Sequence, residues 1–317
     1  MSRTVAVRAP TRIDLGGGWT DVPPYCDREG GFVCNVAITR YSMATISAVE
    51  GADSNSGSDS DSGLLRAIVR RSALSHAWIG LRNDFPVGAG LGGSSAASAA
   101  MLVAAAEWRG DPWDRGAIAE MGRRVEVEDL GVAGGRQDHY AATFGGALAL
   151  TFTQTVAVRR IALGTAARDA LSARSILVYT GQSRISGDTI TAVLGSYERR
   201  DPLVVTALKR MRELAEQMTV ALERADLDAL GALLDEHWQF QRSLHPSIPT
   251  PLIDEIIRRA KSAGALGAKA MGASGGGCVL ILTREGGESR VRSAVTSLGT
   301  FVDFGVDIDG VCAVRRE

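Results

Sequence analysis

Alternating apolar and polar positions dominate the first half of the chain. In residues 4–9, Val5 and Val7 fall on one face of an extended backbone, which is the period-two pattern of a strand. The same reasoning predicts the other regular elements of this half. They are strands over 32–38, 43–49 and 77–83, helices over 64–74 and 114–129, and two strands between 147 and 163.

Helical spacing dominates the second half. Val204, Leu208, Met211, Met218 and Leu222 recur at intervals that place them on one helix face, and we interpret them as core. Further helices are expected over 227–242, 252–263 and 288–298, and strands over 175–179, 268–271, 278–283 and 301–308. This mixture is typical of a ferredoxin-like α+β domain. For a chain of 317 residues we therefore predict an α+β fold with two domains, residues 1–165 and 166–317.

A glycine-rich stretch separates the strand at 77–83 from an alanine-rich helix that runs to about Glu107. It reads Pro86-Val-Gly-Ala-Gly-Leu-Gly-Gly-Ser-Ser-Ala-Ala, with glycines at 88, 90, 92 and 93. Glycines let backbone N–H groups point inward as a row of donors, and Ser94 or Ser95 is expected to cap the helix. A glycine loop that leads into a helix N-terminus is typical of phosphate binding. The structural alternative is an ordinary glycine loop before a buried helix.

Known nucleotide and hydrolase motifs do not explain these loops. Glycines 88, 90 and 93 satisfy G-x-G-x-x-G, but a turn at 108–113 stands where a dinucleotide-binding fold needs a second parallel strand. No G-x-x-x-x-G-K-[ST] occurs, which excludes a P-loop. Residues 272–276 match G-x-S-x-G, but a helix precedes this motif and a strand follows it, so we reject Ser274 as a nucleophile. The 86–97 stretch is thus a phosphate loop of another kind.

The composition of the chain bears on its partners and on its cellular compartment. Hydrophobic residues make up 45% and charged residues 22% of the chain, and 35 basic against 36 acidic side chains give a net charge of -1. This balance gives no reason to expect a nucleic acid or a membrane as partner. The four cysteines form no C-x-x-C pair, which favours free thiols in a reducing compartment. Because the N-terminus lacks the apolar core of a signal peptide, we expect a cytoplasmic protein.

A second glycine-rich loop lies at 9–24, where Gly16-Gly-Gly-Trp-Thr-Asp21 precedes two prolines. Such a loop is costly to order, so we expect it to line a site. Asp21 is suited either to accept hydrogen bonds from sugar hydroxyls or to stabilise a turn. The insert at 51–63, rich in Ser, Asp and Gly, is interpreted as a mobile surface loop. Calcium binding there is a minor alternative, because the required downstream Glu is missing.

Two acidic residues, Glu126 and Glu128, follow the apolar stripe of the helix expected over 114–129. Negative charge near a helix C-terminus is unfavourable unless a cation compensates it. A metal ion is the functional interpretation, and an ion pair with Arg123 or Arg124 is the structural one. A further glycine-rich turn follows and ends at Asp138.

Three separated motifs together resemble the GHMP kinase family, which includes galactokinase, homoserine kinase, mevalonate kinase and phosphomevalonate kinase. Residues 86–97 are similar to the family's phosphate loop, 8–21 to its N-terminal substrate motif and 269–282 to its C-terminal glycine motif. They occur in the family's order and cover essentially the whole chain. The resemblance implies an ATP-dependent kinase with an N-terminal α/β domain, a left-handed βαβ phosphate loop and a C-terminal ferredoxin-like domain.

Four shorter stretches are similar to the branch of this family that acts on the anomeric hydroxyl of heptoses and L-fucose. They are 16–24, 135–140, 144–146 and 179–184. The last three have close counterparts in D-glycero-D-manno-heptose 7-phosphate kinases, whereas Trp19 is more similar to the fucokinase domain. The bifunctional fucokinases carry a pyrophosphorylase domain in addition. The resemblance therefore favours conversion of the heptose 7-phosphate to its 1,7-bisphosphate, with L-fucose or another free sugar as the alternative.

The resemblance also implies a role for each matching residue. Asp138 would be the catalytic base, and Arg12 the basic residue beside the reacting hydroxyl. Glu126 would bind Mg²⁺, and Ser94 would supply the hydroxyl ligand because Gly93 stands where the family has its magnesium serine. The residues expected to bind ATP are Pro86, Gly88, Gly90, Leu91, Gly92, Gly93, Ser94 and Ser95. Those expected to bind the sugar are Asp21, Gly18, Trp19, Thr20, Gly181 and Arg184.

The expected partners are ATP with Mg²⁺ and a small sugar or sugar phosphate, and we allow for a homodimer. One alternative is a protein of this fold that binds sugar or nucleotide without catalysis. Against it, Arg12, Asp21, Glu126 and Asp138 are all present. The other alternative, a nucleotide-dependent oxidoreductase, is disfavoured by the missing second strand.

Overall fold

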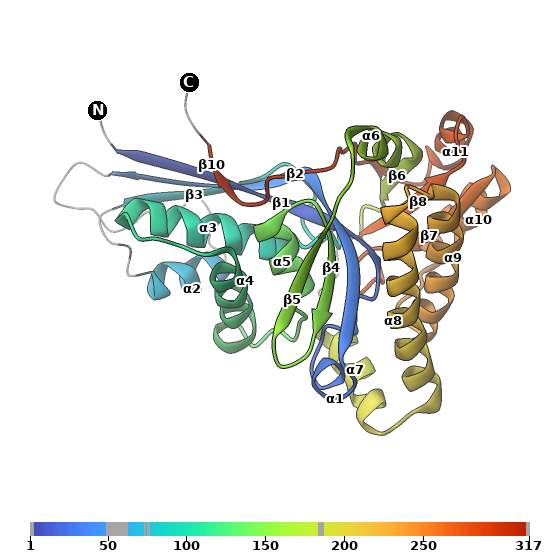
Figure 1. Ribbon diagram of the computed structural model, residues 1–317, viewed down its shortest axis with the longest axis horizontal. Helices are drawn as coiled ribbons and strands as arrows, with labels where there is room; N and C mark the ends of the chain where they lie inside the picture. Colours follow the sequence, from blue (N-terminus) through green and yellow to red (C-terminus); the bar gives the residue numbers. More distant parts are fainter. Residues whose placement is uncertain (1–2, 49–62, 73, 75–76, 183–186, 315–317) are drawn as a thin grey trace.

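The computed structural model describes residues 3–48, 63–72, 74, 77–182 and 187–314. Arg184 lies outside the described residues, as does the insert at 51–63 apart from its last glycine. Within these ranges the chain forms two antiparallel sheets with helices packed against each (Figure 1).

The first sheet, counted over the described ranges, has six strands in the order β10-β1-β2-β4-β5, with β3 also paired to β2. Their bounds are β1 Thr4–Gly16, β2 Gly31–Ala48, β3 Ala77–Asn83, β4 Ala147–Phe152, β5 Val156–Ile161 and β10 Cys312–Ala313. The edge strand β10 joins β1 through the pairs Val7↔Ala313 and Arg8↔Cys312. A segment from late in the chain therefore completes the sheet that the first residues begin.

Small side chains allow α3 (Gly93–Arg109) to pack closely on β1 and β2. Every residue of α3 from 95 to 106 is buried, most of them alanines. Other helices near this sheet are α2 Gly63–Arg71, α4 Arg115–Arg124 and α5 Gln137–Phe144, with the π-helical turn η1 Val125–Asp129 directly after α4 (Figure 1). The short helix α1 Tyr25–Glu29 follows the loop after β1.

The second sheet has the order β7-β8-β6-β9. Its strands are β6 Ser175–Tyr179, β7 Ala265–Ala270, β8 Cys278–Thr283 and β9 Thr300–Phe301. The helices of this half are α6 Thr165–Arg174, α7 Gly187–Glu198, α8 Pro202–Glu223, α9 Leu227–Ser243, α10 Pro251–Ser262 and α11 Glu288–Val295. Asp201, Asp226 and Thr250 cap α8, α9 and α10 by accepting a backbone N–H, which fixes where these helices begin.

One buried apolar cluster joins the two halves. It includes Ile13 and Val36 of the first sheet, Met218 of α8 and Leu280 of β8. The helix α8 packs against β1 and β2 as well as against α9. Since β10 also returns to the first sheet, a domain boundary at 165 stays a prediction.

Several expected elements differ from those in the structure. The strand expected over 4–9 continues to Gly16 as β1, so it includes the first residues of the loop expected over 9–24. The strands expected over 32–38 and 43–49 are one continuous strand, β2, because β1 pairs along nearly its whole length. The helix expected over 114–129 is α-helical only to Arg124. It then widens into a π turn, in which the Leu130 N–H bonds the Val125 carbonyl. The strand expected over 301–308 is reduced to β9, and Val306 forms an isolated bridge with Ile38.

Candidate active site

The phosphate loop, defined here as residues 86–92, leads from β3 into α3. Gly88, Gly90 and Gly92 have φ values of 72°, 74° and 72°, which side chains with a Cβ rarely adopt. Gly92 is the N-cap of α3 and no side chain caps this helix, so the expected cap by Ser94 or Ser95 is wrong. Both serines lie within the first turn of α3. The unpaired N–H groups of that turn are therefore available to an anion.

Arg12 and Asp138 form an ion pair against the phosphate loop. The guanidinium donates from Nε to Asp138 Oδ1 at 2.7 Å and from Nη2 to Oδ2 at 2.8 Å, and its Nη1 donates to the Gly90 carbonyl at 2.7 Å. A Cβ on Gly92 would lie 3.2 Å from the Asp138 carboxylate. The Arg12 side chain is 4% exposed and that of Asp138 is 28% exposed. The two residues expected to be catalytic are thus in contact, and the carboxylate stays accessible.

Asp138 lies in the first turn of α5, where the sequence had suggested only a turn. This helix begins at Gln137, whose backbone N–H donates to Asp21 Oδ2 at 2.9 Å. A helix N-terminus stabilises nearby negative charge. The start of α5 therefore brings together Asp21 and Asp138, which are far apart in the sequence.

Asp21 is buried, with 1% of its surface exposed. Burial raises the pKa of its carboxyl to about 6, the Gln137 N–H opposes this shift, and the charges of Asp138 and Asp14 add to it. A Cβ on Gly135 would lie only 1.9 Å from Asp21 Oδ2, so a glycine there lets the chain pass over the carboxylate. The Asp21 carboxylate is therefore a buried hydrogen-bond acceptor that the Gln137 N–H holds in place.

The sugar loop, defined here as residues 16–21, is tightly constrained. Gly17 and Trp19 have φ values of 87° and 85°, and for Trp19 this left-handed conformation is strained. Trp19 is 6% exposed and packs in a buried apolar cluster of the second half, which also contains Val178 of β6. The Thr20 hydroxyl donates to the Gly17 carbonyl at 2.7 Å. Contacts of Gly18, Trp19 and Thr20 with a sugar stay predictions.

Glu126 lies in the π turn, which directs its carboxylate toward α5. Glu126 Oε2 is 3.0 Å from His139 Nε2, and the second oxygen, Oε1, is buried without a hydrogen bond to any described residue. Burial alone would raise the pKa of Glu126, but the His139 charge and interactions with His139 and Ser94 leave it lowered. The pKa of His139 is raised because Glu126 outweighs the effect of burial. Glu126 therefore pairs with His139, and not with Arg123 or Arg124 as in the structural interpretation.

The donor set around Glu126 fits Mg²⁺. The ion takes hard oxygen ligands and is commonly held by one or two carboxylates together with substrate phosphates. Glu126 offers a buried unpaired oxygen, and the Ser94 hydroxyl lies beside it at the start of α3. Among the described residues, no group of three or more His, Cys, Asp or Glu side chains is arranged to hold a metal unaided. A metal here would thus depend on phosphate oxygens as well.

The C-terminal glycine loop, residues 271–277, packs directly on the phosphate loop. The Cys278 N–H donates to the Ala89 carbonyl at 2.8 Å. A Cβ on Gly90 would lie 2.7 Å from the Met271 carbonyl, so only a glycine permits this approach. The two glycine motifs therefore form one surface. Gly181 follows β6 beside this loop with a φ of 75°, and its role in sugar binding stays a prediction.

The sequence reasoning missed several buried polar residues that surround these loops. They include Asp14, Gln137, His139, His237, Gln241 and Lys269. Lys269 is the first residue of the C-terminal glycine motif and His139 follows Asp138, so their positions in the sequence could have indicated that both belong to the site. His237 gave none, because an isolated histidine within a helical pattern is indistinguishable from core.

Within the described residues, none of the helices is both long and apolar enough to cross a membrane. Two family profiles match the chain. The profile of the GHMP kinases N terminal domain covers residues 62–146, and that of the GHMP kinases C terminal domain covers residues 218–300.

Several characterised proteins are similar to this chain. It is 30% identical to the D-glycero-alpha-D-manno-heptose 7-phosphate kinase of Campylobacter jejuni, over 87% of this chain and 88% of that protein. It is 25% identical to the bifunctional fucokinase/GDP-fucose pyrophosphorylase of Arabidopsis thaliana over 89% of this chain, but spans only 30% of that longer protein.

Among solved structures, a D-glycero-D-manno-heptose 1-phosphate kinase from Bacteriodes thetaiotaomicron superposes with a TM-score of 0.76 and 26% identity, over 99% of both chains. The two-domain architecture expected from the sequence is confirmed by this match and by the two profiles. The chain therefore belongs to the GHMP kinase family and is a phosphotransferase with a hydroxyl group as acceptor.

Proposed function

We propose that this protein is an ATP-dependent sugar 1-kinase that converts D-glycero-D-manno-heptose 7-phosphate to the 1,7-bisphosphate. The observation that carries the proposal is the Arg12–Asp138 pair, held by two hydrogen bonds against the phosphate loop. It places an accessible carboxylate beside the backbone donors at the start of α3. Asp21 is connected to the same region, because it accepts the Gln137 N–H at the N-terminus of α5.

In the proposed reaction, Asp138 accepts the proton of the anomeric hydroxyl as its oxygen attacks the γ-phosphorus of ATP. The bond from this phosphorus to the β–γ bridging oxygen breaks, and ADP leaves. Each carboxylate oxygen of Asp138 has a second lone pair, so its bonds to Arg12 do not prevent it from accepting the proton. Arg12 also lies where it meets the negative charge that develops on the transferred group.

The phosphates of ATP would lie along 86–95, bonded by backbone N–H groups of the phosphate loop and the first turn of α3. Glu126 and Ser94 would hold Mg²⁺, which would supply positive charge to neutralise the phosphate oxygens. Asp21 would accept hydrogen bonds from sugar hydroxyls, and so hold the anomeric carbon in line. Most of the catalysis would then be positioning and electrostatic stabilisation.

The preference for the heptose phosphate rests on similarity. The heptose 7-phosphate kinase of Campylobacter jejuni matches 87% of this chain, while the fucokinases are longer proteins, of which this chain covers 30% and 36%. L-Fucose is the second candidate, supported by Trp19 in the sugar loop. A cytoplasmic location and a homodimer stay predictions.

The decisive experiment is an ATP-consumption assay over a panel of acceptors. The panel contains D-glycero-D-manno-heptose 7-phosphate, the corresponding 1-phosphate, the free heptose, L-fucose, galactose and mevalonate. We expect the highest kcat/KM with the 7-phosphate, and ³¹P NMR of the product should show a new anomeric phosphate. A higher kcat/KM with L-fucose would transfer the assignment to the second candidate. Phosphorylation at a hydroxyl other than the anomeric one would overturn the 1-kinase assignment.

A further inference from the structure

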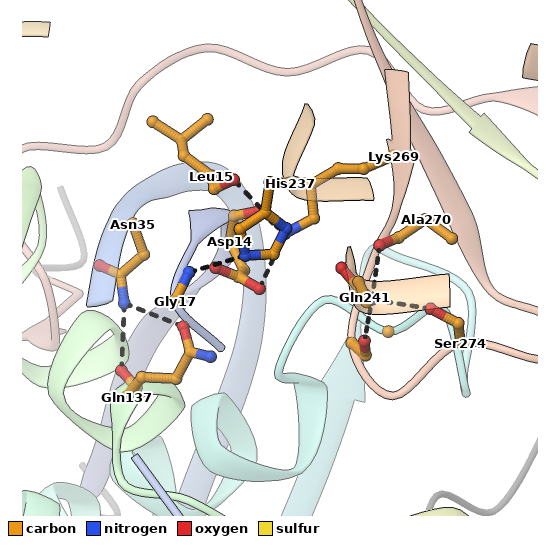
Figure 2. A network of polar contacts seen from close by, with 12 residues as sticks. Asp14, Leu15, Gly17, Asn35, Gln137, His237, Gln241, Lys269, Ala270 and Ser274 are labelled. Atoms are coloured by element: carbon orange, nitrogen blue, oxygen red, sulfur yellow. Dashed lines mark hydrogen bonds and ion pairs between the residues drawn. The ribbon is translucent and has the colours of Figure 1, made fainter. Parts of the chain in front are cut away.

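The helix α9 places two buried side chains one turn apart on the same face, His237 and Gln241. Each binds a different loop of the candidate site (Figure 2). The ring of His237 accepts the Gly17 N–H through Nε2 at 3.0 Å, which ties α9 to the sugar loop. The amide of Gln241 donates to the Gly272 carbonyl at 3.1 Å and to the Ser274 hydroxyl at 2.9 Å, which ties α9 to the C-terminal glycine loop. A single helix thus contacts both sides of the site.

His237 is held in the form that this bond requires. Burial and the nearby charge of Lys269 lower the pKa of the ring well below its ordinary value, so Nε2 keeps its lone pair. The side chain is fully buried, and Nδ1 has no hydrogen-bond partner among the residues that the structure describes. Among the described residues, the Gly17 N–H is the hydrogen-bond partner that accounts for a polar side chain at this buried position. The Gly17 backbone passes close to β2, since a Cβ there would lie 1.9 Å from the Phe32 carbonyl oxygen, so only a glycine fits at this position.

Lys269 supports the same loop from β7. Its ammonium donates to the Asp14 carbonyl at 2.9 Å and to Asp14 Oδ2 at 3.0 Å, with the Leu15 carbonyl at 3.4 Å. These acceptors lie directly before the sugar loop. A Cβ on Gly18 would lie 2.4 Å from Asp14 Oδ2, so the carboxylate touches the loop itself. The second half of the chain therefore fixes both the entry to the sugar loop and its first turn.

We propose that His237 and Gln241 are separate positioning residues on one helix, His237 for the sugar loop and Gln241 for the glycine loop beside the phosphate loop. This inference rests on the proposed function for the assignment of sugar to one loop and ATP to the other. It requires that the two side chains affect different substrates. A purely structural role would affect both substrates alike, or neither.

The test is a pair of matched variants, His237→Leu and Gln241→Leu, whose KM values are measured for both substrates. Loss of the Nε2 acceptor leaves the Gly17 N–H buried and unpaired, and we expect KM for the acceptor sugar to rise about 5- to 150-fold with KM for ATP within about twofold. Gln241→Leu should show the reverse pattern. Equal changes in both KM values for either variant, or a lower melting temperature with both KM values unchanged, would overturn the proposal.

A conservative pair covers the case in which His237→Leu does not fold. Glutamine can present a carbonyl oxygen near the position of Nε2, whereas asparagine is too short to reach Gly17. We therefore expect His237→Gln to keep KM for the sugar within about threefold of wild type, and His237→Asn to raise it by the larger factor above. If glutamine and asparagine behave alike, the hydrogen bond to Gly17 does not set sugar binding.

Hydrogen exchange separates failure of this inference from failure of the proposed function. If the wild-type protein phosphorylates a different acceptor, that acceptor takes the place of the heptose phosphate in the KM measurements. If none is phosphorylated, exchange is compared by mass spectrometry in peptides that cover 12–24 and 268–278. Faster exchange in 12–24 alone for His237→Leu, and in 268–278 alone for Gln241→Leu, supports the division. Faster exchange in both peptides for either variant contradicts it.

Discussion

Two ion pairs are formed by residues of β1 that lie only two positions apart. One joins Arg12 to Asp138 and the other joins Asp14 to Lys269. The two pairs differ in their exposure to solvent. The Asp138 side chain is 28% exposed, whereas Lys269 is fully buried and the Asp14 side chain is 5% exposed. Residues i and i+2 of a strand share one face, so both pairs lie on the same side of β1. The first pair lies against the phosphate loop, where Arg12 donates to the Gly90 carbonyl. The second pair is buried close to Gly17 of the sugar loop (Figure 2).

Because they differ in exposure, the two ion pairs are suited to different roles, one to stability and the other to proton transfer. A sealed pair cannot exchange protons with substrate, and removing one partner leaves an uncompensated charge in the interior. Burial lowers the pKa of Lys269, and Asp14 opposes that shift, so each group depends on the other. An accessible carboxylate can instead accept a proton and release it to water. We therefore expect substitutions in the first pair to affect turnover and those in the second to affect stability.

The largest effect on turnover is expected for Asp138→Asn. The amide cannot act as the base, and general base catalysis is worth roughly 10²- to 10⁴-fold, so the single-turnover rate should fall by at least that order. ATP affinity should stay close to wild type, and the melting temperature should fall less than for a change in the buried pair, because the amide oxygen keeps one of the two hydrogen bonds from Arg12 and water reaches this pair. A lower melting temperature with near-normal turnover would make Asp138 structural.

The largest effect on stability is expected for Asp14→Asn. The buried Lys269 ammonium loses its counter-charge, and breaking a buried pair costs about 3–5 kcal/mol of the free energy of unfolding, measured by urea denaturation. A double variant, Asp14→Leu with Lys269→Met, removes both charges and should recover much of this loss. If the double variant is no more stable than the single one, the pair does not act through charge compensation.

A smaller effect is expected when Glu126 is changed to Gln. The neutral amide is a poor Mg²⁺ ligand, and the Mg²⁺ concentration for half-maximal activity should rise about 10- to 100-fold, as for loss of a residue that supports a metal. Glu128→Gln is the matched control, since that side chain is 57% exposed and pairs with Arg71 at 3.1 Å. Superimposable Mg²⁺ titrations for wild type and Glu126→Gln would place the ligand elsewhere.

The last prediction concerns Asp21 and the pH dependence of sugar binding. Its carboxyl pKa is raised to about 6, so below that pH the free protein loses the charged acceptor and kcat/KM for the sugar should fall about tenfold per pH unit. Asp21→Asn should remove this inflection and weaken sugar binding by about 1.5–3 kcal/mol at pH 8. Because the folded pKa lies above the unfolded value, Asp21 should also lower the free energy of unfolding as pH rises from about 4 to about 6. An unchanged inflection in Asp21→Asn would assign it to another group.

Local pattern was enough to predict most of the fold. The bounds of β3 and β6 agree with the sequence, and α8, α9 and α10 agree within two residues, because their apolar spacing and capping residues act locally. The single strand β2 was not predictable, since it continues through polar residues only because neighbouring strands pair with it. The π turn at Val125–Asp129 has no sequence signature of its own.

The candidate site was predictable where a motif carries it and not where packing does. Arg12 and Asp138 were named from the sequence, and they are in contact in the structure. The expected cap of α3 by Ser94 or Ser95 was wrong, because the N-cap position falls on Gly92, which has no side chain, and both serines lie within the helix. His237 and Lys269 act only through long-range contacts with Gly17 and Asp14. No local property of the sequence could have indicated those partners.

The pairing of β10 with β1 has a consequence for synthesis of the chain. Val7 pairs with Ala313, which the ribosome adds on the order of 300 residues later. At 5–20 residues per second this delay is roughly 15–60 s, during which the outer edge of β1 has unpaired backbone groups. Such an edge is a template for pairing with another chain. This edge of β1 therefore stays open to aggregation in the nascent protein until residues 312 and 313 have been made.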